Sequence, residues 1–136
     1  MARPIVRLSC ASFVIGVALA GCGTGGPAYG PASPDQVTVV QMTNGFDFDP
    51  RTVRIKVGDT VEWRNTSLIT HTVTDDPRHG PEDMSLPANA APFDSGRVPA
   101  GQIFRHTFTV PGTYHYRCDP HDYLDMTGVV IVEAPG

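Results

Sequence analysis

The sequence has few positive charges, few cysteines and no apolar run of membrane-spanning length. It contains 10 Lys and Arg residues against 14 Asp and Glu, which gives a formal net charge of −4 at pH 7, and only 3 cysteines. This charge balance disfavours nucleic acid as a partner. The apolar stretch at residues 8–20 is too short to cross a bilayer comfortably. No stretch has the period of a long amphipathic helix, which argues against an all-α fold.

The N-terminal residues are expected to export and anchor the protein. Arg3 and Arg7 precede the apolar stretch, as in a secretory signal peptide. The stretch ends in Leu19-Ala20-Gly21-Cys22, which resembles the lipobox of bacterial lipoproteins. That resemblance implies that residues 1–21 are a lipoprotein signal peptide and that Cys22 carries the lipid. The alternative is an ordinary secretory signal that leaves Cys22 as an unmodified thiol.

Residues 22–35 are rich in Gly and Pro and are expected to form a tether, followed by a single domain at 36–136. Loss of residues 1–21 would leave 8 basic and 14 acidic residues, a net charge of −6. Such a surface would steer toward basic partners. Cys118 would then be the one unlipidated cysteine, so the domain could form no internal disulfide.

The domain is expected to consist of short β-strands, because apolar and polar residues alternate in it with a period of two. Turn signals such as Asp49-Pro50 and Pro111-Gly112 separate the runs. The run at 128–132 is continuously apolar and indicates a strand buried on both faces. About seven to eight strands at this spacing predict an all-β Greek-key sandwich. The alternating runs are 37–42, 53–57, 61–64, 104–110 and 114–118, and the continuously apolar run 128–132 follows them.

Two further expectations concern the surface of this sandwich. The segment 74–94 is rich in Pro, Asp and Ala and longer than an ordinary connection, and a short helical turn is expected within it at 87–90. On the strand that leads to Cys118, His115 and Arg117 have the opposite parity to the cysteine. Both side chains are therefore expected to be exposed to solvent.

The strongest chemical signal is a group of metal donors near the C-terminus. Cys118, His121 and Met126 form a C-x2-H-x4-M pattern, and His71 lies upstream. Given the cysteine, the composition puts the chance of the other two at those offsets at roughly one in a thousand. A thiolate, two imidazoles and a thioether are the donors of a blue-copper electron-transfer site. Alternatively, Cys118 is an inert buried thiol and the distant His71 is an ordinary surface histidine.

The domain resembles a cupredoxin of the plastocyanin-like kind over nearly its whole length. The resemblance implies a cupredoxin-like sandwich that binds one copper ion, as Cu(I) or Cu(II). His71, Cys118 and His121 would be its equatorial ligands and Met126 its weak axial ligand. The gap between His121 and Met126 is that of plastocyanins, whereas Thr72 stands where they usually have Asn. The similar segments are 46–50, 53–65, 71–73, 93–96, 108–114 and 118–130.

The resemblance implies a type 1 copper protein that shuttles single electrons between a donor and an acceptor redox protein at a membrane surface. We expect a monomer that is exported and held by the lipid on Cys22, at the outer face of the cell membrane or in the periplasm. The alternative is a copper carrier or delivery protein, although the methionine-rich or paired-cysteine sites usual in such proteins are missing. No enzyme is expected, because copper oxidases need further histidines or a second cysteine near Cys118.

The surroundings of His121 suggest how a redox partner would dock. In plastocyanin-like proteins this histidine is the usual electron port. An apolar patch is expected around it, formed by Pro120, Tyr123 and Leu124. An acidic fringe, formed by Asp119, Asp122 and Asp125, would favour a basic docking surface on the partner. The alternative is that these six are ordinary loop residues.

Overall fold

The computed structural model describes residues 36–79 and 86–136. Residues 1–35, which include Cys22, lie outside the described part, so the division into signal peptide, tether and domain stays a prediction. Within the described part, no helix is both long enough and apolar enough to span a membrane. The elements are β1 Val37–Met42, β2 Phe48–Asp49, β3 Thr52–Lys56, β4 Thr60–Asn65, η1 Pro77–His79, β5 Ile103–Thr107, β6 Gly112–Arg117, η2 Asp119–Leu124 and β7 Thr127–Glu133.

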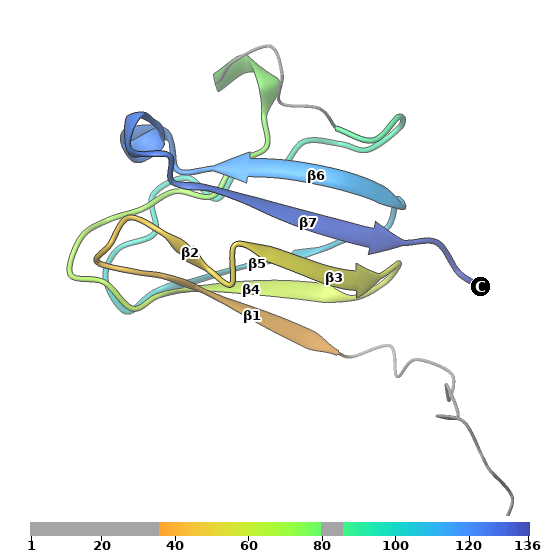
Figure 1. Ribbon diagram of the computed structural model, residues 1–136, viewed down its shortest axis with the longest axis horizontal. Helices are drawn as coiled ribbons and strands as arrows, with labels where there is room; N and C mark the ends of the chain where they lie inside the picture. Colours follow the sequence, from red (N-terminus) through yellow and green to blue (C-terminus); the bar gives the residue numbers. More distant parts are fainter. Residues whose placement is uncertain (1–35, 80–85) are drawn as a thin grey trace, which may run out of the picture.

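The seven strands form two sheets that are packed as two layers (Figure 1). The strand order is β2-β1-β4-β5 in the four-stranded sheet and β3-β7-β6 in the three-stranded sheet. Each sheet contains one parallel pair of strands that are distant in sequence, β1 with β4 and β3 with β7. The neighbours β4–β5 and β6–β7 pair antiparallel. The predicted all-β sandwich is confirmed.

Aromatic side chains fill the space between the sheets, with Trp63 of β4 at their centre. Trp63 is fully buried, and its ring centroid lies 5.3 Å from that of Tyr116, 5.6 Å from that of Phe104 and 5.7 Å from that of Phe93. Rings at such separations attract one another beyond the burial of their surface. This cluster links β4 and β5 of one sheet to β6 of the other and gives the metal-donor residues a rigid base.

Two strand predictions need correction. The strand expected at 104–110 ends at Thr107, after which the backbone of Phe108 bonds to Gly58 and Asp59 instead of continuing the ladder. The run at 128–132 forms β7 but is not buried on both faces. Val130 and Val132 are buried, whereas the alternate residues keep partial exposure. They lie on the outer face of β7, and a two-layer sandwich covers only its inner face.

Arg117 is buried, contrary to the expectation that it would be exposed; its exposed fraction is 1%. A long-range contact accompanies this burial, because the backbone of Thr74 pairs with Arg117 in both directions, at 3.0 and 2.9 Å, and brings a distant segment alongside the edge of β6. The guanidinium is neutralised by Asp119, at 3.1 Å between Nε and Oδ1. His115, on the same face, is exposed as expected.

The described parts of the 74–94 segment contain two tight turns. The 3₁₀ helix η1 was not predicted. At 87–90 the amide of Ala90 donates to the carbonyl of Pro87 at 3.0 Å, which makes a single hydrogen-bonded turn. Asn89 has a φ of 69°, in the left-handed region, so the chain does not continue as a helix there. The expected turn is present, but it is not helical.

Candidate metal centre

The four candidate donors lie where elements end, at one end of the sandwich. Cys118 directly follows β6, His121 lies in η2, and Met126 directly precedes β7. His71 comes from the connection after β4, where it forms an isolated antiparallel bridge with Val98. η2 is packed at the end of the molecule from which β7 starts (Figure 1). The fold therefore brings residues 47 positions apart into one place.

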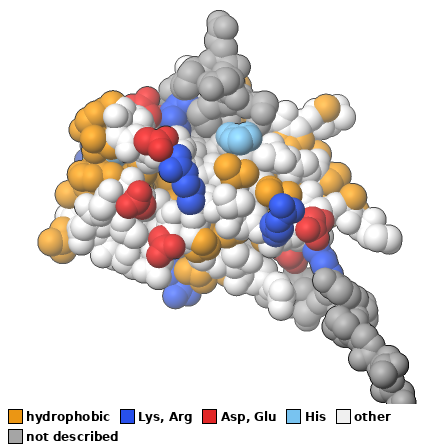
Figure 2. Space-filling model, in the orientation of Figure 1, with side chains coloured by type: hydrophobic (Ala, Val, Ile, Leu, Met, Phe, Trp, Pro, Cys, Tyr) orange, Lys and Arg blue, Asp and Glu red, His pale blue; other side chains and the backbone are white. Residues whose placement is uncertain are grey.

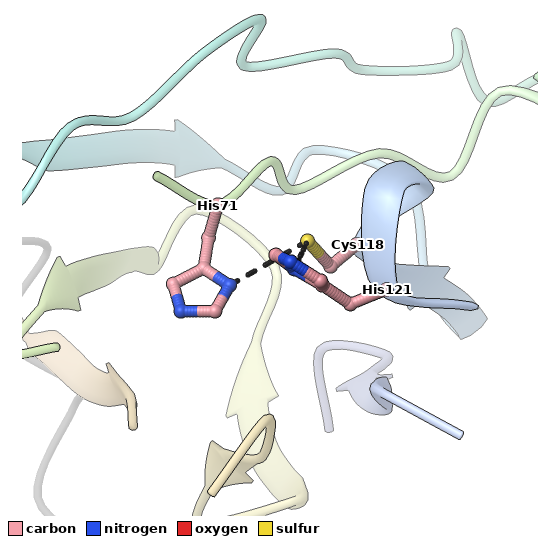
Figure 3. Close-up of side chains that lie close together, drawn as sticks. All are labelled: His71, Cys118 and His121. Carbon is pink, nitrogen blue, oxygen red and sulfur yellow. Dashed lines mark hydrogen bonds between the residues drawn. The ribbon is translucent and has the colours of Figure 1, made fainter. Parts of the chain in front are cut away.

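His71, Cys118 and His121 lie close enough to share one metal ion. The distance from Cys118 Sγ to His121 Nδ1 is 3.2 Å, and that from Cys118 Sγ to His71 Nδ1 is 3.6 Å. One donor atom from each of the three lies within 4.8 Å of the others. Figure 3 shows that both imidazole rings turn Nδ1 toward the sulfur. The structure therefore brings these three predicted residues together in a convergent arrangement.

These separations fit a trigonal N₂S site. Bonds of about 2.0–2.3 Å between a first-row metal and N or S donors, about 120° apart, place the donor atoms roughly 3.5–3.8 Å from each other. The two distances in the structure, 3.6 and 3.2 Å, are close to that range. The chemistry agrees as well, because thiolate and imidazole are the donors that suit copper. The residues present therefore fit a copper ion.

The fourth candidate, Met126, is held next to Cys118 by the backbone. Its side chain is fully buried, and its carbonyl accepts a 3.0 Å hydrogen bond from the amide of Cys118. On the outside of the loop, Arg51 Nη2 donates to Asp125 Oδ2 at 2.9 Å and to Thr127 Oγ1 at 2.5 Å. Arg51 thus ties down the residues on both sides of Met126. Sequence reasoning missed Arg51, which lies 74 residues from Asp125.

The His71 ring is oriented by a hydrogen bond behind it. Its Nε2 lies 3.0 Å from Ser67 Oγ, and both groups are buried. Ser67 Oγ also lies 2.7 Å from Asn65 Oδ1. When Nε2–H donates to the serine, Nδ1 keeps its lone pair for a metal ion, which is the usual arrangement for a ligating histidine. No signal in the sequence singled out Ser67 or Asn65.

Thr72 joins the two segments that supply the donors. Its backbone N–H donates to Cys118 Sγ at 3.3 Å, and its Oγ1 accepts a 2.9 Å hydrogen bond from the amide of Asp119. An N–H group aimed at the sulfur stabilises its thiolate form. The sequence flagged Thr72 only as a departure from the plastocyanin pattern. In the structure its hydroxyl ties the residue after Cys118 to the residue after His71.

Burial sets the ionisation of the metal-free donors. It lowers the pKa of His71, and the nearby His121 lowers it further. Burial raises the pKa of the Cys118 thiol, against the opposing effect of the hydrogen bonds from Thr72. Both shifts favour the neutral forms. The imidazole of His71 is therefore ready to bind a metal at neutral pH, whereas Cys118 must lose a proton when the metal binds.

Apolar groups surround the donors, and His121 reaches solvent. Cys118 and His71 are fully buried, whereas His121 is partly exposed. The ring of Phe46 lies 4.8 Å from that of His121 and 6.4 Å from that of His71, between centroids. Sequence reasoning assigned no role to Phe46 at the site. The outer edge of His121 is thus the donor group nearest to an approaching molecule.

The three residues of the expected apolar patch are exposed, and two of the three aspartates of the expected acidic fringe form ion pairs. Tyr123 is 77% exposed and Leu124 is 43% exposed, and Pro120 is exposed beside them. Figure 2 shows hydrophobic side chains gathered at the end of the molecule that carries η2. Of the aspartates, Asp119 is paired with Arg117 and Asp125 with Arg51, which leaves Asp122 without an ion pair among the described residues.

A two-sheet sandwich that gathers a thiol, two imidazoles and a buried thioether at one end defines the class of protein: a cupredoxin-type copper-binding domain. The family model of copper-binding proteins of the plastocyanin/azurin family matches residues 35–133, and the chain belongs to that family. One copper ion is therefore its cofactor.

Individual relatives agree with this assignment. Halocyanin of Natronomonas pharaonis is 39% identical over 102 residues, 73% of this chain and 57% of the relative. Amicyanin-alpha of Methylorubrum extorquens is 32% identical over 103 residues, 76% and 75% of the two chains. A Cu(I) structure of an amicyanin variant aligns with a TM-score of 0.57 and 29% identity, covering 71% of this chain and 82% of that one. The chain spans 57–65% of the length of the first curated relatives that it matches.

Proposed function

We propose that this protein is a type 1 copper protein that carries single electrons between redox proteins. His71, Cys118 and His121 would be the equatorial ligands, and Met126 the weak axial ligand. The observation that carries the proposal is the convergence of His71 Nδ1 and His121 Nδ1 on Cys118 Sγ, at 3.6 and 3.2 Å. These donors suit both oxidation states of copper, and a bound ion would supply one-electron chemistry at this place.

The residues around the donors suit rapid electron exchange, because they restrict movement. Ser67 fixes the ring of His71, and Thr72 ties the Cys118 segment to the His71 segment. The backbone bond from Cys118 to Met126 closes the loop. Donors that are held in place in the metal-free protein can shift little when the charge of the site changes by one. A small rearrangement means a low barrier for outer-sphere electron transfer. The proposal includes no enzymatic reaction.

Electrons would enter and leave through His121. This ring is partly exposed, while His71 and Cys118 are fully buried. The apolar patch of Pro120, Tyr123 and Leu124 lies next to it in the chain and would let a partner approach closely and leave quickly. Because Asp119 and Asp125 are already paired, Asp122 is left as the acidic group of this surface that can attract a basic partner.

The location we propose is an exported one. Cys22 would carry lipid after removal of residues 1–21, and residues 22–35 would let the domain move beside the outer face of the membrane or within the periplasm. Each buried methylene of an acyl chain contributes about 0.8 kcal/mol to membrane binding. Mass spectrometry of the membrane-extracted protein tests this part, because a diacylated or triacylated Cys22 at the mature N-terminus is expected. An unmodified N-terminus would refute it.

The visible spectrum of the copper-loaded protein tests the electron-transfer proposal. We expect an intense blue Cu(II) form with reversible one-electron reduction by voltammetry, and no blue colour for Cys118→Ala. A copper delivery protein would instead give up copper rapidly to a chelator without a blue state. That second result would refute the electron-transfer proposal and leave the metal centre intact.

A further inference from the structure

Arg97 stands out because its charge is uncompensated. In residues 36–79 and 86–136, the other arginines each pair with a carboxylate, and Lys56 also has an interaction partner. Figure 2 shows the same tendency on one face, where acidic and basic side chains lie side by side. Arg97 is exposed and makes no ion pair or hydrogen bond with a described residue. Among the described arginines of a chain whose net charge is −4, Arg97 is thus the one without a carboxylate partner in the described part.

The second notable feature of Arg97 is its position. It lies on the wall of a hollow of about 470 Å³ next to the proposed copper ligand His121. Asp119 also faces the hollow, but its carboxylate is paired with the buried Arg117. The unpaired charge of the hollow is therefore that of Arg97. The residues that line the hollow are Thr70, Thr72, Arg97, Asp119, Pro120 and His121.

The surface around His121 consequently differs from the acidic fringe that the sequence suggested. With Asp119 and Asp125 paired, Asp122 is the unpaired anion of the loop that carries His121, and Arg97 is the unpaired cation on the wall of the hollow. A surface with one charge of each sign distinguishes between orientations of a partner, whereas a uniform acidic fringe does not. Such a pattern contributes to register and specificity more than to affinity.

Building on the proposed electron-transfer function, we propose that the hollow beside His121 receives a carboxylate side chain of the redox partner and that Arg97 pairs with it. The planar guanidinium of arginine matches a carboxylate with two parallel N–H···O bonds. Pro120 belongs both to the apolar patch and to the lining of the hollow. A protein that covers the patch to reach His121 therefore also covers the hollow, which is why the occupant is a group of the partner.

The test measures electron transfer between the copper-loaded full chain and two proteins of opposite charge. Reduced plant-type ferredoxin serves as an acidic probe and reduced cytochrome c as a basic one. Arg97→Glu is expected to slow the reaction with ferredoxin about three- to tenfold at low ionic strength, with the difference shrinking as salt is added. The rate for Arg97→Lys is expected to lie between that of wild type and that of Arg97→Glu. The reaction with cytochrome c is expected to stay unchanged or become faster.

A matched control separates this local effect from net charge. Arg54→Gln removes one positive charge from the three-stranded sheet, where Arg54 lies 3.9 Å from Glu133 and is remote from the donor loop. It is compared with Arg97→Gln, which makes the same change in net charge. Of these two variants, we expect only Arg97→Gln to slow electron transfer from ferredoxin. Equal effects of the two variants would overturn the proposal, because the response would then reflect the overall charge.

Hexacyanoferrate(III) distinguishes a partner carboxylate from a small anion. If Arg97→Glu slows oxidation by hexacyanoferrate but leaves the ferredoxin rate unchanged, the hollow takes small anions only and the proposal is overturned.

Docking is followed separately by ¹⁵N NMR of the Cu(I) protein with oxidised ferredoxin, in which shifts at Thr70, Thr72 and Arg97 are expected. A wild type that binds ferredoxin at these residues but exchanges no electrons would refute the proposed function alone. Absence of these shifts would refute the docking proposal alone.

Discussion

The carboxyl group of Asp75 makes the stability of this protein depend on pH in an unusual direction. Its side chain is fully buried. Oδ1 accepts a 2.6 Å hydrogen bond from the amide of Phe93, whereas Oδ2 has no partner among the described residues. Burial raises the pKa of Asp75 from 3.8 to about 7, and the hydrogen bond from Phe93 opposes this only in part. The neighbouring Asp76, paired with Arg78, raises it slightly further.

The direction in which the free energy of unfolding changes with pH follows from the number of protons bound in the folded and unfolded states. Between pH values of about 4 and 7, the folded protein keeps a proton on Asp75 that the unfolded chain has lost. The free energy of unfolding therefore falls as pH rises through this window. Each pH unit contributes about 1.4 kcal/mol, so the full loss is about 4 kcal/mol. Above pH of about 7 both states are ionised and the loss is complete.

The variant Asp75→Asn isolates this effect. The amide keeps the shape of the side chain and an acceptor for Phe93, but it carries no charge. Urea unfolding of the copper-free protein is measured for variant and wild type at pH 5 and at pH 8. From pH 5 to pH 8, the free energy of unfolding of the variant is expected to rise by about 2–3 kcal/mol relative to that of wild type. The titrations of His71 and His106 are common to both proteins and cancel in the difference.

Asp122→Asn is the matched control, because Asp122 is exposed. It is expected to give the same difference from wild type at both pH values. If the difference between Asp75→Asn and wild type is also independent of pH, Asp75 is ionised in the folded protein at pH 5, and the reasoning from burial is wrong.

Three further predictions concern the donors and the core. Ser67→Ala removes the hydrogen bond to His71 Nε2 and is expected to weaken copper binding about 10- to 100-fold, measured by competition with a chelator. Gly128→Ala is expected to destabilise the protein by about 1–3 kcal/mol in urea unfolding, because the new Cβ would clash with the ring of Tyr116 at Cζ. Copper affinity is expected to rise up to about tenfold per pH unit below the pKa of the Cys118 thiol, measured by the same competition, because binding displaces its proton.

Each of these three has its own contradicting outcome. Ser67→Thr keeps the hydroxyl, and if it binds copper as weakly as Ser67→Ala, the hydrogen bond is not the cause. Gly136→Ala adds a methyl group in open space and should leave stability unchanged, so an equal loss at both glycines would rule out the clash with Tyr116. A copper affinity that does not vary with pH would mean that Cys118 is already a thiolate in the metal-free protein.

The sequence predicted those features that depend on local pattern. Alternation placed five of the seven strands, because each side of a strand faces one environment, and the continuously apolar run at 128–132 placed β7. The spacing of Cys118, His121 and Met126 could be recognised because all three lie in one short loop between β6 and β7. His71 gave no such signal by itself, and only the resemblance to cupredoxins connected it to the loop.

Features that depend on contacts between distant segments could not be predicted. The parity of Arg117 was read correctly, but its burial goes with a distant segment, because the backbone of Thr74, 43 positions earlier, pairs with it along the edge of β6. Likewise, the charge around His121 depends on which aspartates form an ion pair with an arginine. Arg51 reaches Asp125 across 74 residues. Counting acidic residues along the loop therefore overestimated the negative charge that a partner would meet.

The hydrogen bond between the amide of Cys118 and the carbonyl of Met126 extends the β6–β7 ladder by one more rung. The spacing of the two sulfur-bearing residues is thus set by the sheet, and the seven residues between them form a loop whose two ends are held by the strands. Substitutions in the middle of this loop can change the surface that a partner protein contacts without moving Cys118 and Met126 apart. Natural variation in surface recognition could therefore proceed there while the sulfur pair keeps its place.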